Sequence, residues 1–205
     1  MTNSSEKIRR WVTFAMLAAL VALLQVFGGL IPMPGGIAPT LALIPIVLGG
    51  VLLGVWYGAA LGALFGLITV LQAPFGALTL VLFSEKPVLF VLIAMVKAIA
   101  AGVVPALIYH VFARKYPRAG VVVASISAPI INTVIFVLGM LTILDTVEGF
   151  IAADPDLGGV SALKFVFSAI ISINFVVELL VNAVLSPAIY RVIVAVQKRK
   201  WSAPQ

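Results

Sequence analysis

The sequence predicts an all-α integral membrane protein, a bundle of six transmembrane helices in one domain that covers residues 1–205. Three observations support this prediction. Hydrophobic residues make up 63% of the chain and charged residues only 10%, with a mean hydropathy of +1.24, which lies far outside the range of soluble domains. Apolar runs of about 20 residues, the length needed to cross a bilayer, leave only short polar connections. These runs are continuously apolar rather than alternating, which favours helices over a β-barrel.

The spans are placed by the apolar runs and by the polar residues between them. The six predicted spans cover residues 11–30, 41–55, 58–75, 87–112, 121–144 and 165–196. The first follows a basic KIRR sequence and could mimic a secretory signal, but it continues to Leu30 without a small-x-small cleavage site and is therefore taken as a span. The apolar run from 41 to 75 is too long for one crossing. Trp56 and Tyr57, which favour the membrane interface, mark the expected turn within it.

A glycine stands at every fourth position across the second and third spans. These glycines are Gly50, Gly54, Gly58, Gly62 and Gly66. Four-residue spacing keeps small residues on one helix face, where two backbones can approach closely. We interpret this ladder as tight helix packing. The alternative is a smooth face that slides against a partner during transport.

Basic residues set the expected orientation of the bundle. Three clusters precede the first span, separate the fourth from the fifth and finish the chain: Lys7, Arg9 and Arg10; Arg114, Lys115 and Arg118; Arg191, Lys198, Arg199 and Lys200. With six spans all three clusters lie on one side, which the positive-inside rule makes cytoplasmic. We therefore expect a multi-pass protein of the cell membrane with both termini in the cytoplasm. The net charge of +6 reflects this topology and contact with anionic membrane lipid, and nothing argues for nucleic acid as a partner.

The sequence predicts no enzyme, no cofactor and no metal site. It lacks the G-x-x-x-x-G-K-[ST] motif, so it does not bind ATP through a P-loop. Its one histidine, His110, is expected at the cytoplasmic end of the fourth span, with no second His, Cys or Glu at metal-ligand spacing. No histidine at membrane depth is available to activate a serine nucleophile.

Polar residues at membrane depth are the unusual feature of this chain. Lys97 lies ten residues into the fourth span, roughly 15 Å below the outer surface. A charge at that depth costs on the order of 2.5 to 3.5 kcal/mol, so we expect Lys97 to face the bundle interior with a partner. The sixth span presents Asn174, Glu178 and Asn182 on one face, and the fifth contributes Asn132. Counting from the outer helix ends places Asn174 and Asn132 near the depth of Lys97, and Glu178 about one turn lower.

Two interpretations of this cluster remain open. In the first, Lys97, Asn132, Asn174 and Glu178 line a substrate-binding cavity, which Gln72 near the outer end of the third span extends. In the second, Lys97 and Glu178 form a buried ion pair that only holds the bundle together. The asparagines favour a binding site, because they add more hydrogen-bonding capacity than an ion pair requires.

Four stretches of the sequence are together typical of one family. They are AMLAALVA in the first span, PTLALIPIVLGGVLLGVWYGAALGALFGL across the second and third, SAPIINTVIFVLGM in the fifth and NFVVELLVNAVLSPAI in the sixth. Through them the chain resembles, along almost its whole length, the substrate-binding S components of energy-coupling factor (ECF) vitamin transporters. The resemblance implies an ECF S-component-like bundle of six helices that captures a vitamin from outside and topples within the bilayer to release it.

The resemblance also implies partners and a surface that binds them. Energy would come from a transmembrane coupling subunit (EcfT) and two ATPase subunits (EcfA and EcfA'), which would account for the missing P-loop. In that family an A-x-x-x-A face of the first span docks on the coupling subunit. The residues that match this face here are Ala15, Ala19 and Ala22.

The stretches around Asn132, Asn174 and Glu178 are most similar to the pantothenate subgroup of the family. Pantothenate has a carboxylate for Lys97, and an amide and two hydroxyls that asparagines and Glu178 could bind. Other vitamins, among them riboflavin, folate, niacin and pyridoxine, remain alternatives, although a flavin or pterin would normally require several stacking aromatic side chains.

Two further classes remain open. In a small ion-coupled secondary transporter, Lys97 and Glu178 would relay protons or ions without an ATPase partner. Six spans would then require a dimer or internal repeats, and no clear repeat is visible in the sequence. A purely structural membrane subunit would explain the glycine and alanine faces but not the buried polar cluster.

Overall fold

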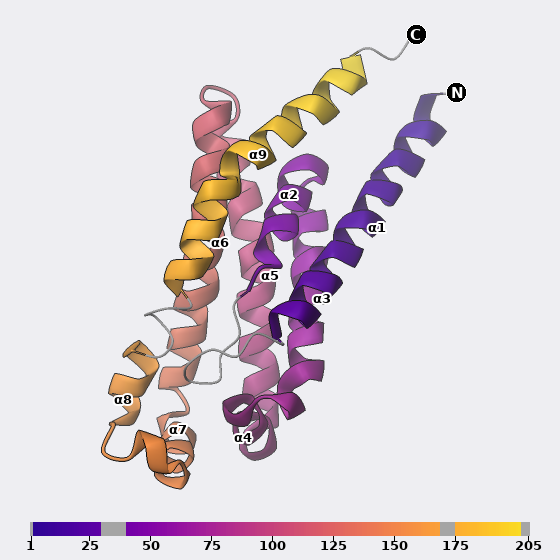
Figure 1. Cartoon of the computed structure of the whole chain (residues 1–205). Helices are drawn as coiled ribbons and strands as arrows, with labels where there is room; N and C mark the ends of the chain where they lie inside the picture. The colour runs from indigo at the N-terminus through magenta and orange to yellow at the C-terminus, as the bar shows by residue number, and fades with distance from the viewer. Residues whose placement is uncertain (1, 30–39, 169–174, 202–205) are drawn as a thin grey trace.

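The computed structural model describes residues 2–29, 40–168 and 175–201. These residues form a bundle of long helices, some of them clearly inclined, with short helices gathered at one end (Figure 1). In chain order the elements are α1 (Thr2–Gly29), α2 (Leu43–Leu53), α3 (Val55–Gln72), η2 (Ala73–Phe75), α4 (Ala77–Glu85), α5 (Pro87–Phe112), α6 (Pro117–Leu141), α7 (Leu144–Ala153), η3 (Pro155–Leu157), α8 (Ala162–Phe165) and α9 (Phe175–Trp201).

Five helices of the described chain are long and apolar enough to cross a membrane. Their membrane-compatible stretches are Ser4–Gly28, Val55–Phe75, Pro87–Phe112, Pro117–Leu141 and Phe175–Ala195. These helices confirm the all-helical membrane class. The predicted second span corresponds to α2, which has 11 residues and a length of about 16 Å, so α2 alone is shorter than a bilayer core.

The connections at one end of the bundle contain more structure than the sequence predicted. Three short helices, α4, α7 and α8, lie where we expected only short polar links. Their apolar side chains, such as Leu78 and Leu82 of α4 and Val147 and Ile151 of α7, are buried against one another and against the long helices. Each of these helices is short and buries only one face, so the sequence of each segment contains too few apolar residues to predict a buried helix.

The turn between α2 and α3 is made by Gly54. Its φ of 115° lies in the region that side-chain-bearing residues rarely adopt, and nothing approaches the position of a β-carbon there. The prediction of a turn at Trp56 and Tyr57 is therefore wrong by two residues. Trp56 instead lies in the first turn of α3, with 87% of its surface exposed.

The other ladder glycines bring α2 and α3 against α5. A β-carbon on Gly58 would lie 2.5 Å from the carbonyl oxygen of Gly102, and one on Gly62 would collide with the carbonyl oxygen of Ala98. A β-carbon on Gly50 would lie 2.9 Å from that of Ala106. The glycine face is thus buried inside the protein, which supports the packing interpretation over a sliding face for a partner.

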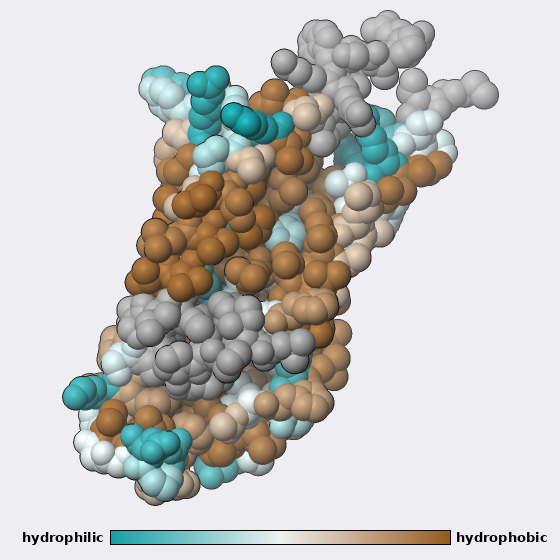
Figure 2. Space-filling view, in the orientation of Figure 1, coloured by the Kyte–Doolittle hydropathy of each residue, from teal (hydrophilic) through white to brown (hydrophobic). Residues whose placement is uncertain are grey.

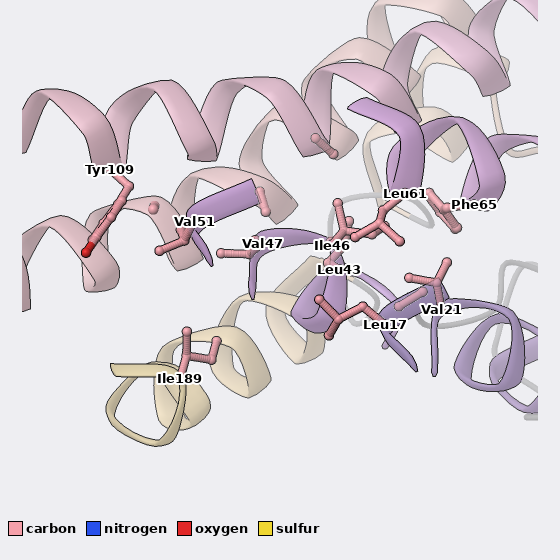
Figure 3. Packing of buried hydrophobic residues seen from close by; sticks show 14 of the residues in the cluster. Leu17, Val21, Leu43, Ile46, Val47, Val51, Leu61, Phe65, Tyr109 and Ile189 are labelled. Atoms are coloured by element: carbon pink, nitrogen blue, oxygen red, sulfur yellow. The ribbon is translucent and has the colours of Figure 1, made fainter. Parts of the chain in front are cut away.

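Two hydrophobic cores fill the bundle. The first, here called the bundle core, joins α1, α2, α3, α5, α6 and α9; Figure 3 shows part of it, including Leu17, Val21, Leu43, Ile46, Val47, Val51, Leu61, Phe65, Tyr109 and Ile189. The second, here called the cap core, joins α4, α7 and α8 to the adjoining ends of α5 and α6. It contains Ala73, Leu78, Leu82, Phe90, Val137, Met140, Ile143, Val147, Ile151, Ala162, Phe165 and Val166.

The two chain ends lie at the same end of the bundle, opposite α4, α7 and α8 (Figure 1). The connection between α5 and α6, which carries Arg114 and Lys115, lies at the end that holds the termini. On the face shown in Figure 2, the coloured surface between the two ends is largely hydrophobic, and hydrophilic residues gather toward the two ends. This distribution is that of a protein embedded across a bilayer.

Candidate functional site

A cluster of buried polar side chains lies inside the bundle. Lys97 is 9% exposed, Asn132 4%, Glu178 3% and Asn182 1%. Such groups are costly to bury in an apolar bundle unless they are paired or have a function. The partners of each side chain therefore decide how the cluster is interpreted.

Three helices bring these residues together. Lys97 lies near the middle of α5, which packs extensively against both α3 and α6. Asn132 lies on α6, and α6 in turn packs against α9. Glu178 is in the first turn of α9 and Asn182 follows one turn later. A carboxylate in a first turn is stabilised by the positive end of the helix dipole, so the start of α9 is a favourable place for Glu178.

Glu178 also fixes the chain just before α2. Its Oε1 atom accepts a hydrogen bond of 2.9 Å from the backbone N–H of Thr40. The amide of Asn132 lies beside the same carboxylate. The sequence did not predict a role for Thr40, because the donor is its backbone N–H and no pattern of side chains indicates such a contact.

Lys97 makes no close ion pair with Glu178. Among the described residues, ion pairs within 4.0 Å join Arg9 to Glu6 and Lys86 to Asp145, and none involves Lys97. The Lys97 Nζ atom instead faces two aromatic rings, 4.6 Å from the centroid of Phe136 and 5.8 Å from that of Phe65. This arrangement argues against the interpretation in which Lys97 and Glu178 serve only as a structural ion pair.

Three buried oxygen atoms of the cluster lack a hydrogen-bond donor among the described residues. They are Oδ1 of Asn132, Oδ1 of Asn182 and Oε2 of Glu178. The amide nitrogen of Asn182 is occupied, because it donates a 2.8 Å hydrogen bond to the backbone carbonyl of Glu178. Buried acceptors normally have donors, so the cluster is chemically complementary to a molecule with hydroxyl or N–H groups and an anionic group for Lys97.

Two predicted site residues stand apart from this cluster. Gln72 belongs to the contact between α1 and α3, where its Oε1 accepts a 3.1 Å hydrogen bond from Gln25. The Gln25 amide also lies 3.4 Å from the hydroxyl of Thr69. The substrate-binding role of Gln72 remains a prediction. Asn174 lies outside the described residues, so its predicted role is likewise untested.

The predicted docking alanines lie on α1. Ala15 and Ala19 are exposed and Ala22 is half-buried. Ala18, on a different face of the same helix, packs against the bundle core. The exposed alanines stand between large exposed side chains such as Met16 and Leu20, so they form a shallow face on an apolar surface.

A separate hollow of about 420 Å³ lies between α7, η3 and α8, at the end of the bundle opposite the two termini. Glu148, Asp154 and Ser161 contribute polar groups to it. It is open to the surface and does not include Lys97 or Glu178. In the described part of the chain, no three His, Asp or Glu side chains gather as a metal site would require.

Comparison with known families found a match over most of the chain. The family model described as "ECF transporter, substrate-specific component" matches residues 9–190. The match includes the residues of the polar cluster, with all of α5 and α6 and the part of α9 up to residue 190. A comparison with curated proteins found no significant match.

Proposed function

The chain belongs to the family of substrate-specific components of ECF transporters, and on that premise we propose that it binds a small carboxylated vitamin, with pantothenate as the lead substrate. Proteins of this family are transporter subunits and not enzymes. The polar cluster at Lys97, Asn132 and Glu178 is the proposed binding site, with Asn174 and Gln72 as further predicted contributors.

One observation supports this proposal most strongly. Among the residues that the structure describes, the buried ammonium of Lys97 has no close carboxylate partner, and three buried oxygens of Asn132, Asn182 and Glu178 have no donor. A ligand carboxylate would supply the missing anion. Pantothenate also has two hydroxyls and one amide N–H, which are donors for unpaired oxygens. A molecule with both kinds of group would satisfy the cluster better than an apolar or purely cationic one.

Niacin is the second candidate, and a specific observation favours it. Phe136 and Phe65 place two aromatic rings beside Lys97. A flat aromatic acid could direct its carboxylate to the ammonium while its ring packs on a phenylalanine. Niacin would leave more of the unpaired oxygens without donors than pantothenate, which makes it the second choice.

Lys97→Met tests the site directly. In a dehydrated cavity a charge-assisted hydrogen bond contributes about 1.5 to 3 kcal/mol, so this variant should weaken pantothenate binding by roughly one to two decades. The measurement is a titration of purified protein with pantothenate, with its alcohol analogue that lacks the carboxylate, and with niacin. Lys164→Met, which removes an exposed lysine, is the matched control and should bind like the unmodified protein.

Thermal unfolding separates binding from stability in the same variants. If Lys97 served only to neutralise Glu178, Lys97→Met would lower the unfolding temperature and adding Glu178→Gln would restore it. Equal affinity of the unmodified protein for pantothenate and its alcohol analogue would show that Lys97 does not bind the carboxylate. Binding of riboflavin or pyridoxine in place of both acids would leave the family role standing and refute the substrate.

We also propose that both termini lie in the cytoplasm, because the basic clusters gather at that end of the bundle. The chain has no cysteine of its own, so any labelling of a single-cysteine variant by a thiol reagent comes from the introduced residue. Cysteine at Asp154 or Ser161, beside α8, should react with an impermeant thiol reagent outside intact cells. Cysteine at Ala119, at the start of α6, should react only after the membrane is opened, and the reverse pattern would invert the orientation.

A further inference from the structure

The buried ammonium of Lys97 lies close to two phenylalanine rings. Its distance to the Phe136 centroid is 4.6 Å and to the Phe65 centroid 5.8 Å, and both fall within the range of about 6 Å over which a ring face attracts a cation. Glu178 is near enough for its charge to act on Lys97, but the two do not close to an ion pair within 4.0 Å.

The two rings come from different helices, Phe136 from α6 and Phe65 from α3. Phe136 follows Asn132 by one turn on α6, so the two side chains share a helix face. Phe65 stands on α3 between Gly62 and Gly66, where the missing side chains let the backbone of α3 approach α5. Phe65 belongs to the bundle core, whereas Phe136 packs against the cap core. Lys97 therefore lies at the junction of the two cores.

We propose that Phe136 is a positioning residue whose ring holds the Lys97 ammonium away from Glu178 and so keeps it available for a substrate carboxylate. This inference rests on the proposed function, because it concerns the same site. A lysine side chain has a flexible four-carbon stem and can point its charge in several directions. In a dehydrated bundle its strongest alternative partner is the carboxylate of Glu178.

An ion pair between Lys97 and Glu178 would occupy the two charged groups of the site at once. A ring face attracts the ammonium without neutralising its charge and leaves N–H donors free for an incoming anion. Phe136 suits this role better than Phe65 because its ring is closer to Nζ. Phe65 is also almost fully buried in the bundle core, where its packing serves the fold as a whole.

Phe136→Leu tests the role by the preference of the protein for acid over alcohol. This preference is the dissociation constant of the alcohol analogue divided by that of pantothenate. Phe136→Leu and Phe136→Met should each lower it by roughly tenfold, while Phe136→Tyr, which retains a ring face, should preserve it. Phe90→Leu removes a buried ring from the cap core without touching Lys97, so this control should leave the preference unchanged.

A second comparison tests the mechanism. If the ring acts by keeping Lys97 from Glu178, then Phe136→Leu should cost much less acid preference in a Glu178→Gln background, where no competing carboxylate remains. The quantity to compare is the acid preference of the Glu178→Gln variant divided by the acid preference of the Glu178→Gln, Phe136→Leu double variant. An equal loss of acid preference in both backgrounds would overturn the inference, as would an equal loss in Phe136→Tyr and Phe136→Leu.

A measurement without substrate separates this inference from the proposed function. In protein labelled with ¹³Cε-lysine, the Lys97 signal, assigned by its absence in Lys97→Met, should be shifted upfield by the ring of Phe136. The shift should disappear in Phe136→Leu and persist in Phe136→Tyr. An unshifted signal in the unmodified protein would refute the positioning role. A shifted signal in a protein that binds acid and alcohol equally would confirm the contact and refute the carboxylate substrate.

Discussion

The two ends of the bundle are packed by different means. At the end that holds the termini, α2 and α3 lie against α5 so closely that Gly50, Gly58 and Gly62 leave no room for a methyl group. At the other end, side chains of α4, α7 and α8 interlock in the cap core, and a β-carbon on Gly149 of α7 would meet nothing within 4 Å. Backbone-to-backbone packing tolerates almost no added volume, whereas packing through side chains can adjust.

This difference also bears on the site between the two ends. The close approach of α3 to α5 fixes where Phe65 stands relative to Lys97, while Phe136 is held from the side of the cap core. The glycine ladder is therefore part of what shapes the polar cluster. Damage to the ladder should affect both stability and ligand binding, and damage to the exposed parts of the cap should affect neither strongly.

The largest expected effect comes from adding one methyl group to the ladder. Gly58→Ala would push a β-carbon against the carbonyl oxygen of Gly102, 2.5 Å away, and both atoms belong to helix backbones that cannot yield independently. Overpacking of this kind costs about 1 to 3 kcal/mol. We expect a lower free energy of unfolding and a weaker affinity for ligand, measured by thermal unfolding and titration of the purified protein.

Gly149→Ala is the matched substitution at the other end. Gly149 is exposed within α7 and has open space around it, so alanine should raise the free energy of unfolding by up to about 1 kcal/mol through its better helix propensity. If Gly58→Ala were as well tolerated as Gly149→Ala, the contrast between the two ends would not hold.

The all-helical membrane class and several helix bounds could be predicted from the sequence. The predicted span 87–112 matches the observed limits of α5, because Pro87 begins the helix after the charged residues Glu85 and Lys86, and Arg114 follows its end. The depth of Lys97 in the membrane followed from the number of residues between it and the start of this helix. Depth also placed Asn132 near Lys97 and Glu178 about one turn lower, since residues at similar depth in a small bundle have few other neighbours.

The remaining features depend on contacts that no pattern of single residues specifies. The turn at Gly54 requires a positive φ, and a ladder of identical glycines does not say which of them turns. The hydrogen bond from Thr40 to Glu178 involves a backbone donor. The rings beside Lys97 were missed because Phe136 and Phe65 are ordinary apolar residues in sequence. Gln72 pairs with Gln25 because the angle between α1 and α3 determines which polar groups meet.

An effect on assembly is expected at the exposed face of α1. Ala15 and Ala19 are exposed on α1, so replacing both with leucine should disturb a close contact with the coupling subunit without entering the bundle. Co-purification with the coupling subunit should fall sharply, while vitamin binding by the isolated chain persists.

Ala18→Leu sharpens this test, because Ala18 packs against the bundle core. Added volume at that position should lower the unfolding temperature of the isolated chain instead of acting first on assembly. Loss of vitamin binding with intact assembly in the Ala15/Ala19 double variant would assign the alanine face to the internal bundle.

The smallest expected effect belongs to the ion pair of the cap. The Nζ atom of Lys86, just before α5, lies 2.9 Å from the Oδ2 atom of Asp145 in α7. The hydrogen bond from Lys86 holds the pKa of the Asp145 carboxyl below its usual range, and the hydrogen bond to Asp145 raises the pKa of Lys86. A lowered carboxyl pKa stabilises the folded state above the unfolded value of about 3.9, and this contribution is lost as the pH falls through the folded pKa. A raised lysine pKa stabilises it below about 10.4, and that contribution is lost as the pH rises through the folded pKa.

The pair should therefore contribute fully only between roughly pH 4 and pH 10, and weakly, because both side chains are exposed to screening by water and salt. Asp145→Asn and Lys86→Met should each lower the unfolding temperature near pH 7 by about 2 °C or less, and the double variant should fall no further than either single one. Glu148→Gln, which removes an exposed carboxylate from the same helix, controls for net charge. A loss as large as that of Gly58→Ala, or one that persists in high salt, would mean that this bridge holds the cap as firmly as the glycines hold the opposite end.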